Sequence, residues 1–386
     1  MQLFSNQPLR SKPHIAVLSS SKIGNFVVIT PLLRGLKEKY PDSTIDFFGS
    51  EMTKDLEINC PYINWRFSLY DNDPDFLINL AQAVKQRSEM AGSYDLAINC
   101  DEYSEINLVL ITAIRPTYFV GGALSPDFRL KVDTSHDPVQ KILEDSDWNS
   151  PAFLQRHREI VNSNYISEIF CRIAYVETDF FKLELPSKPP NFPVPDILIS
   201  VTATRPAKMW SIDYWKQIIN WCENQDLTVG LVGNSPKIQK KLYYSDGIEE
   251  ELIAQTSLID LRGKTSLVEL AGAFRRAKAS IVLDSGPLHI SAAVGCPTVA
   301  IFGNDIDGHG ASPIRLWAPN LPHVKIALSD FKCQKCEDNL FKNKSCLVEN
   351  HPCMTHLLPQ TVIKHLLVLL NREEKLIIEE MILLEK

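Results

Sequence analysis

Residues 284–289 read Asp-Ser-Gly-Pro-Leu-His and lie between a short apolar run and a segment with helical spacing. Gly286 lets the backbone approach a ligand closely, and Pro287 suits the first position of a helix. The free N–H groups and the dipole at a helix start bind anions, so the segment can cradle a phosphate, with Ser285 and His289 adding hydrogen bonds. The spacing fits an ordinary helix cap equally well, and both interpretations stay open.

A second loop that carries basic residues, 201–210, lies between an expected strand and an expected helix. We expect Thr204 and Lys208 at the same edge of the sheet as Asp284. There the Lys208 ammonium would neutralise a departing diphosphate, since cations stabilise developing charge on phosphoryl oxygens. Arg205, taken alone, is expected to be a solvated loop residue.

The N-terminal counterpart is the loop 19–25, Ser-Ser-Ser-Lys-Ile-Gly-Asn. It is neither a dinucleotide-binding glycine pattern nor a P-loop, which argues against a dinucleotide oxidoreductase and against an NTPase. It still brings the Asn25 side chain to the start of the first expected helix. Asp101 and Glu102 follow another expected strand; we expect them to be solvated loop acids, and the alternative is that they reach the same site.

Four of the nine cysteines form a cluster near the C-terminus, Cys333-x2-Cys336-x9-Cys346-x6-Cys353. A C-x2-C pair with two further cysteines is the pattern of a structural zinc site, in which four thiolates close the coordination. A loop of reduced thiols and a disulfide clip are the open alternatives. The other five cysteines are scattered, mostly among apolar residues, and are expected to be small buried hydrophobes.

Composition limits the class of protein. The 386 residues carry a net charge of −7, with 45% hydrophobic and 23% charged residues, which is typical of a globular protein with a large core. A mildly acidic chain is not expected to bind nucleic acid. No window reaches the roughly 20 apolar residues of a membrane-spanning helix, and the first residues lack the apolar segment of a signal peptide. We therefore expect a cytoplasmic protein.

Two series of alternating strands and helices flank a proline-rich joint at 186–195, which predicts parallel sheets with ligands bound at the carboxyl ends of their strands. We expect a first domain over 1–185, a linker over 186–195 and a second domain over 196–358 that includes the Cys-rich loop 333–353. A final helix over 359–386 is expected to pack back on the first domain. The expected strands are 14–18, 44–49, 95–100, 118–120, 196–201, 227–232, 258–261, 281–283 and 297–302, and the expected helices are 26–40, 76–89, 211–224, 266–277 and 287–294.

Several segments resemble those of a known family. Residues 22–25, Lys-Ile-Gly-Asn, followed by 30–37 and Tyr40-Pro41, resemble the opening of the family 9 glycosyltransferases, the heptosyltransferase-like proteins. Residues 283–293 and 297–303 resemble the most diagnostic segment of that family. Three smaller matches occur at Thr204-Arg205 with Lys208 and Trp210, at 263–267, and, more weakly, at His157 with Glu159. The matches follow family order over nearly the whole chain.

The resemblance implies a GT-B fold, an α/β architecture of two Rossmann-like domains whose parallel sheets face each other across a cleft. It implies an inverting transfer of a heptose or related sugar from an ADP-linked donor such as ADP-heptose to a lipopolysaccharide-type or other saccharide acceptor, with no metal at the chemistry. A lipid-linked acceptor would bring the enzyme to the inner face of the membrane as a peripheral protein. By position, the implied donor-binding residues are Thr204, Lys208, Thr265, Asp284, Ser285, Gly286 and His289.

Two departures from the family pattern matter. The family carries its catalytic base, an Asp, where this chain has Asn25, and an amide does not take up a proton at neutral pH. Either another group such as Asp101 serves, or Asn25 only positions the acceptor, or activity is lost. Ala203 replaces a common Thr and removes one phosphate donor. A protein that binds nucleotide sugar or glycan without turnover is therefore the main alternative, and a sugar-nucleotide epimerase or hydrolase is the weaker one.

Overall fold

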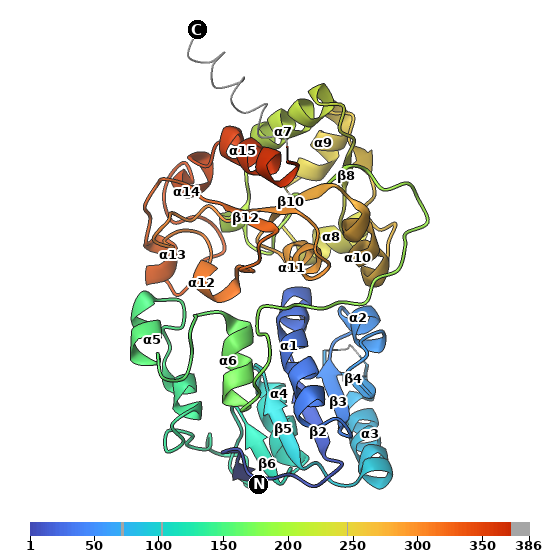
Figure 1. Ribbon diagram of the computed structural model, residues 1–386, viewed down its shortest axis with the longest axis vertical. Coiled ribbons are helices and arrows are strands. Elements are labelled where there is room, and N and C mark those ends of the chain that lie inside the picture. The colour runs from blue at the N-terminus through green and yellow to red at the C-terminus, as the bar shows by residue number, and fades with distance from the viewer. Residues whose placement is uncertain (71–72, 102, 245, 372–386) are drawn as a thin grey trace. The chain divides into compact units, whose positions relative to one another are not determined.

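The computed structural model describes residues 1–70, 73–101, 103–244 and 246–371. The chain divides into two compact units, Met1–Pro186 and Ser187–Lys386, and the division falls at the start of the proline-rich segment. Within the described residues, each unit is built around one six-stranded sheet whose strands all pair in parallel (Figure 1). The expected α/β class is confirmed.

The sheet of the first unit has the order β1-β6-β5-β2-β3-β4. Its central strand β2 is buried at every position, as expected of an apolar run with helices on both faces. The long helix α1 accommodates Pro31 and packs against α6. The strands are β1 (Gln2–Leu3), β2 (His14–Leu18), β3 (Thr44–Gly49), β4 (Trp65–Ser68), β5 (Leu96–Asn99) and β6 (Tyr118–Val120), and the α-helices are α1 (Ile23–Lys39), α2 (Lys54–Ile58), α3 (Phe76–Ala91), α4 (Glu105–Ala113), α5 (Pro151–Arg156) and α6 (Ile166–Ile173).

The sheet of the second unit has the order β12-β11-β10-β7-β8-β9. Helices lie on both sides of it: α7 packs with α15 on one side, and α10 with α11 on the other (Figure 1). The strands are β7 (Ile197–Ser200), β8 (Val229–Leu231), β9 (Ile259–Asp260), β10 (Ala279–Leu283), β11 (Thr298–Ile301) and β12 (Val324–Ala327), and the α-helices are α7 (Ile212–Asn224), α8 (Pro236–Leu242), α9 (Ile248–Gln255), α10 (Leu267–Arg276), α11 (Gly286–Ala293), α12 (Ile314–Trp317), α13 (Lys335–Asp338), α14 (Pro352–Thr355) and α15 (Pro359–Leu369).

The C-terminal helix corrects one expectation. We expected residues 359–386 to pack back on the first domain, but α15 packs within the second unit, against α7, β11 and β12. Val362 and Leu366 are fully buried there, next to Trp215 and Ile219 of α7. The reason is that α15 presents an apolar stripe that completes the cover of this sheet. The rest of the expected helix, 372–386, lies outside the described residues.

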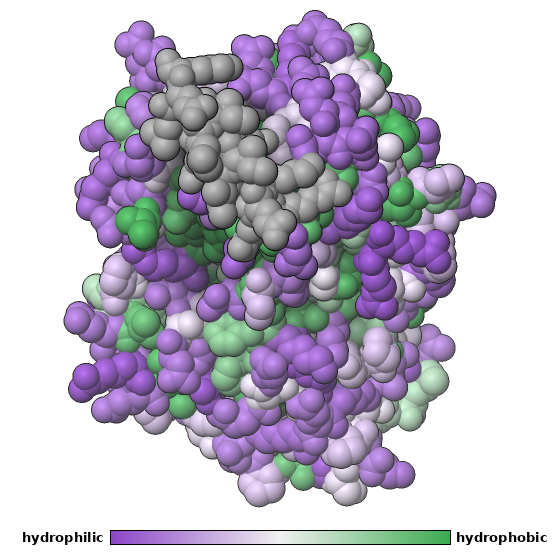
Figure 2. Space-filling view, turned by 45° about the horizontal axis from the view of Figure 1, so that its top comes forward, coloured by the Kyte–Doolittle hydropathy of each residue, from purple (hydrophilic) through white to green (hydrophobic). Residues whose placement is uncertain are grey.

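The exterior on the face shown in Figure 2 is mostly hydrophilic, with hydrophobic residues in smaller groups. Among the described residues, no helix combines the length and the apolar character needed to cross a bilayer.

Each sheet has one point where the chain reverses its direction of strand addition. In the first unit, β2 and β5 are neighbours there, and in the second unit β7 and β10 are neighbours. Loops that follow such a strand pair leave toward opposite faces of the sheet and open a crevice at its carboxyl end, where ligands of open α/β sheets bind. These two points define where candidate site residues are sought.

Candidate functional site

A buried ion pair lies at the switch point of the second unit. Lys208 is in the loop after β7, and Asp284 directly follows β10. Their side chains meet, with Lys208 Nζ 2.5 Å from Asp284 Oδ2, and expose only 16% and 7% of their side-chain surface. Burial by itself would raise the pKa of the Asp284 carboxyl, but the Lys208 charge and hydrogen bond hold that pKa below its ordinary value. The Asp284 carboxyl is therefore ionised at neutral pH.

His289 is buried one turn into α11, close to this pair. Burial lowers its pKa to about 4; the Asp284 charge opposes the decrease and the Lys208 charge adds to it. Its Nδ1 atom is buried and has no hydrogen-bond partner among the described residues. Its ring meets the Trp317 ring edge-on, with centroids 6.4 Å apart. At neutral pH, His289 is therefore an uncharged imidazole with an unused polar atom.

The N-cap residue of α11 does not bond to the free backbone N–H groups at the start of the helix. Ser285 occupies the N-cap position, but its side chain makes no cap hydrogen bond and instead donates to the Leu283 carbonyl oxygen at 3.3 Å. Ser285 and Gly286 are both half-buried. An uncapped helix start with a cation beside it is suited to an anion. This geometry favours the phosphate cradle over the ordinary helix cap.

The other two predicted donor residues lie in the loops after β7 and β9. Thr204 precedes Lys208 in the same loop and is exposed. Thr265 is half-buried in the loop after β9, at the edge of the sheet, and so lies farther along the strand order from Asp284. That loop is joined to the loop after β8 by a hydrogen bond from Gly263 N to the Gly233 carbonyl oxygen, 2.9 Å long.

The environment of the Arg205 side chain differs from the one we expected. Instead of pointing into solvent, it is half-buried and donates to the backbone carbonyl oxygens of Ala311, Phe341 and Asn343. These carbonyls belong to segments more than 100 residues away in the chain. Sequence reasoning missed them because no local pattern marks a carbonyl as an acceptor for a distant arginine.

The switch point of the first unit holds Asn25 and Asp101. Asn25, at the start of α1, donates from Nδ2 to Ser20 Oγ. Asp101 comes after β5, the neighbour of β2, and the pairing continues past the strands through Cys100 N to the Leu18 carbonyl oxygen at 2.9 Å. Asp101 is half-buried, and burial raises its pKa above the ordinary value, while backbone hydrogen bonds and the Lys22 charge oppose that increase. Glu102 lies outside the described residues.

The four clustered cysteines gather in one region of the second unit. Cys336 and Cys353 are buried, and Cys333 and Cys346 are half-buried. Burial, together with the smaller effect of the charges of the other three cysteines, raises the pKa of the Cys353 thiol to about 12. In the described part of the chain, however, no three of these sulfur atoms lie within 4.8 Å of one another.

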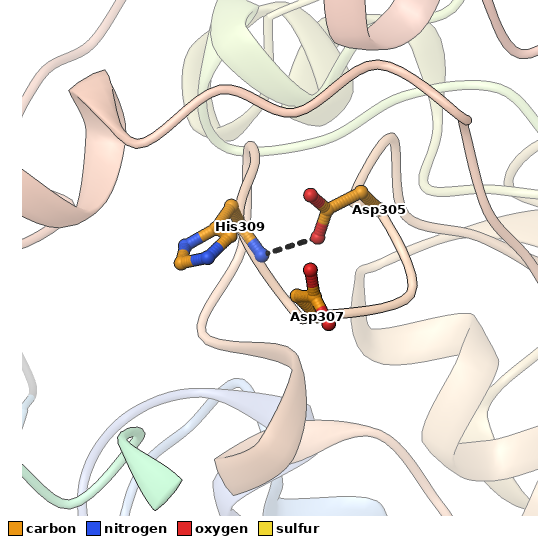
Figure 3. Close-up of side chains that lie close together, drawn as sticks. All are labelled: Asp305, Asp307 and His309. Atoms are coloured by element: carbon orange, nitrogen blue, oxygen red, sulfur yellow. Dashed lines mark hydrogen bonds between the residues drawn. The ribbon is translucent and has the colours of Figure 1, made fainter.

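Such a tight group is formed by Asp305, Asp307 and His309, in the loop after β11 (Figure 3). Each of the three already has a protein partner. Asp305 accepts a hydrogen bond from His309 N at 2.9 Å, Asp307 pairs with Lys332 at 3.0 Å, and His309 Nδ1 lies 2.9 Å from Glu337. The group is explained as a loop-ordering network, and we assign it no metal.

Part of the second unit is similar to a known protein family. Residues 175–346 match the model of glycosyltransferase family 9 (heptosyltransferase). The matched residues make up less than half of the chain. The match contains every predicted donor residue from Thr204 to His289, whereas Asn25, Asp101 and Cys353 lie outside it.

Two curated proteins that the chain resembles are heptosyltransferases. Lipooligosaccharide heptosyltransferase 2 of Campylobacter jejuni is 28% identical over 160 residues, which are 41% of this chain and 45% of that protein, so the match spans about half of its length. Lipopolysaccharide heptosyltransferase 3 of Escherichia coli K12 is 23% identical over 72% of this chain and 79% of that protein.

Solved structures show the fold. A family 9 glycosyltransferase from Veillonella parvula has a TM-score of 0.66 at 17% identity, covering 94% of this chain and 98% of that one. TibC from enterotoxigenic E. coli, described as an iron-containing heptosyltransferase and solved with ADP-D-β-D-heptose, has a TM-score of 0.56 at 15% identity, covering 94% and 77%. The chain therefore has the GT-B fold that the resemblance implied.

Proposed function

We propose that this protein is a glycosyltransferase that moves a heptose or related sugar from an ADP-linked donor to a saccharide acceptor of the lipopolysaccharide type. The observation that carries the proposal is the Lys208–Asp284 ion pair beside the uncapped start of α11. A cation and free backbone N–H groups on one side of a crevice suit a diphosphate. The names of the family 9 relatives supply the sugar and the acceptor class, and TibC supplies the ADP-linked donor.

In the proposed reaction an acceptor hydroxyl oxygen bonds to the anomeric carbon of the donor, while the bond from that carbon to the diphosphate oxygen breaks. The electron pair leaves with ADP, whose growing negative charge is stabilised by Lys208 and the first N–H groups of α11. Attack opposite the leaving group inverts the anomeric centre. The scheme uses these side chains and backbone groups and routes no step through a metal.

The hydroxyl proton needs an acceptor, and Asn25 is unsuited to that role because its amide already donates to Ser20 and does not take up a proton. We propose Asp101 instead. It follows the strand next to the one that leads to Ser20, so its carboxylate lies at the same switch point of the first unit. A carboxyl whose pKa is raised by partial burial is also a better proton acceptor than an exposed one.

We also propose a structural metal, zinc by the preference of four thiolates, at Cys333, Cys336, Cys346 and Cys353. The convergence of the four thiols supports it. Binding would draw the sulfurs closer than they lie in the structure, and would hold the segment that contacts the loop of Lys208. Because the acceptor class is lipid-linked, we further propose that the protein works at a membrane surface.

The proposal is tested by calorimetry with ADP and by incubation of the protein with ADP-heptose and a panel of core-oligosaccharide acceptors. We expect ADP binding, and ADP release that depends on one acceptor. Binding without release on any acceptor would favour the second candidate, a nucleotide-sugar-binding protein without turnover, which the amide at Asn25 supports. Conversion of ADP-heptose without acceptor would indicate an epimerase or hydrolase. No ADP binding would contradict all three.

A further inference from the structure

We propose that Arg205 is a positioning residue of the donor site: it fixes the loop that carries Lys208 by joining three separate segments of the second unit. The inference rests on the proposed function, because it assigns Arg205 a role in holding a donor-binding lysine. It differs from the donor-binding set itself, since the Arg205 guanidinium is engaged by protein atoms and would act through Lys208.

The contacts of Arg205 carry the first step. Its Nη2 donates to the Ala311 carbonyl oxygen, and its Nη1 donates to the carbonyl oxygens of Phe341 and, at 3.2 Å, of Asn343. Ala311 lies in the loop after β11, and the other two lie in the Cys-rich segment. One side chain thus ties the loop after β7 to two segments that are distant in sequence.

The loop is held to the Cys-rich segment at further points. Ala207 N donates to the Lys344 carbonyl oxygen at 3.0 Å, and the Ala207 carbonyl oxygen lies 2.8 Å from His351 Nε2. Beyond that segment, the Trp210 side chain donates from Nε1 to the Leu357 carbonyl oxygen at 2.8 Å. Lys208 therefore projects from a loop that is held by the Ala207 backbone before it and by the Trp210 side chain after it.

The third segment, the loop after β11, is itself ordered. Asn304 is fully buried, and its Nδ2 donates to the carbonyl oxygens of Gly308 and Ser312, each at 2.8 Å. Ala311, the acceptor for Arg205, directly precedes Ser312. Arg205 is therefore bonded to a loop that is itself held in place by the hydrogen bonds of Asn304.

The chemistry of the side chain explains why an arginine stands here. The planar arginine guanidinium has several N–H donors and can bond to carbonyl oxygens of two segments at the same time. A lysine ammonium carries its donors on one nitrogen atom and cannot span both segments. A lysine at 208 that is already aimed at the diphosphate position needs no reorganisation when the donor binds. Loss of the guanidinium would free the loop and lower donor affinity without removing any donor contact.

The experiment uses the full chain and the variants Arg205→Ala, Arg205→Lys, Lys208→Ala and the double variant Arg205→Ala/Lys208→Ala. The Kd of ADP is measured by calorimetry, and donor KM and kcat are measured wherever turnover occurs. Lys278→Ala is the matched control: Lys278 pairs with Asp196 at 2.8 Å, at the opposite ends of the same two strands, β7 and β10. Circular dichroism and thermal melting verify the fold of each variant.

We expect Arg205→Ala and Arg205→Lys each to weaken ADP binding about tenfold, with the larger effect on donor KM than on kcat, because the freed loop no longer holds Lys208 in place before the donor binds. In the Lys208→Ala background, the same Arg205→Ala change should alter the Kd less than twofold, since residues that act as a unit are non-additive. An equal weakening in both backgrounds, or full function of Arg205→Lys, would overturn the inference.

Hydrogen exchange of the ligand-free protein separates this inference from the proposed function. Amides of residues 204–210 should exchange faster in Arg205→Ala than in the wild-type protein, while those of α7 stay unchanged. If the wild-type protein binds no ADP, the proposed function fails, and the inference fails with it even when exchange rises. If it binds ADP but neither exchange nor Kd changes in Arg205→Ala, only the inference fails.

Discussion

Lys208 Nζ lies 2.5 Å from Asp284 Oδ2, and this contact joins the loop after β7 to the end of β10 at the switch point of the second sheet. The two residues are 76 positions apart in the sequence. The pair keeps an ammonium beside the start of α11 in a largely dehydrated place, where its charge acts more strongly than in water. The account of donor binding depends on it.

Removal of the ammonium should impair both binding and transfer. We expect Lys208→Ala to lower kcat/KM for the donor about a hundredfold, because a cation that stabilises the leaving diphosphate contributes on that scale. It should also lower the free energy of unfolding, since Asp284 is left buried with its charge unpaired. Steady-state kinetics and urea unfolding measure the two effects. The control Lys278→Ala should change neither kinetic constant, and unchanged kinetics in Lys208→Ala would count against the site.

Stability should depend on pH through His289. Its pKa is about 4 in the folded chain against 6.5 as an ordinary value, so between these pH values the unfolded chain binds the extra proton. The free energy of unfolding should therefore fall by up to about 3 kcal/mol as the pH is lowered from 6.5 to 4. Urea titrations at several pH values measure this fall, and His289→Gln should reduce it. Equal pH dependence in the two proteins would refute the assignment.

A carboxylate at position 25 should restore the family's base. We expect Asn25→Asp to keep or raise transfer, because the Ser20 hydroxyl can donate to the new carboxylate where it now accepts from the amide. Initial rates over a range of pH measure the effect, with Asn25→Ala as the control that removes the contact. A complete loss of transfer in Asn25→Asp would show that the amide itself is required.

Asp101 should account for the acidic limb of the rate profile in the wild-type protein. A base works only when deprotonated, and burial raises the pKa of this carboxyl, so kcat/KM should fall as the pH is lowered toward that raised pKa. Asp101→Asn should lower kcat about a hundredfold and abolish the limb. Asn25→Asp/Asp101→Asn should recover activity that Asp101→Asn lacks. An unaltered profile in Asp101→Asn would exclude it as the base.

The metal proposal is tested by elemental analysis of protein purified without chelator. We expect close to one equivalent of zinc per chain, lost in the variants Cys336→Ser and Cys353→Ser together with a lower melting temperature. Cys60→Ala, a change at a buried cysteine of the first unit, is the control that should retain metal. Metal-free protein of unaltered stability would leave the segment as a loop of reduced thiols.

The parts that local sequence determines were predicted well. The helix expected at 266–277 is α10, and its capping box is present: Ser266 N donates to Glu269 at 2.8 Å and Glu269 N donates to Ser266 Oγ. The helix expected at 211–224 is α7, and Ser211 occupies its N-cap position but makes no side-chain cap bond. The position at which a helix starts can thus be predicted from local residues. Whether the N-cap side chain forms its hydrogen bond depends on the backbone conformation of the preceding residues.

Contacts between segments that are distant in the sequence were harder to predict. The strands β4 and β12 and the contacts of α15 within the second unit were not predicted, and Arg205 was predicted incorrectly as a solvated residue. Each depends on which distant segments meet, and an apolar stripe such as that of α15 fits more than one surface. The Lys208–Asp284 contact was foreseeable because both residues follow parallel strands, whose carboxyl ends share one edge of a sheet.

The central claim is that a donor diphosphate binds at the start of α11 with Lys208 beside it. The most direct measurement is a crystal structure of the protein soaked with ADP-heptose. The account predicts density for the diphosphate within hydrogen-bonding distance of Lys208 Nζ and of the first backbone N–H groups of α11. Well-defined nucleotide bound away from the carboxyl ends of β7 and β10 would contradict it.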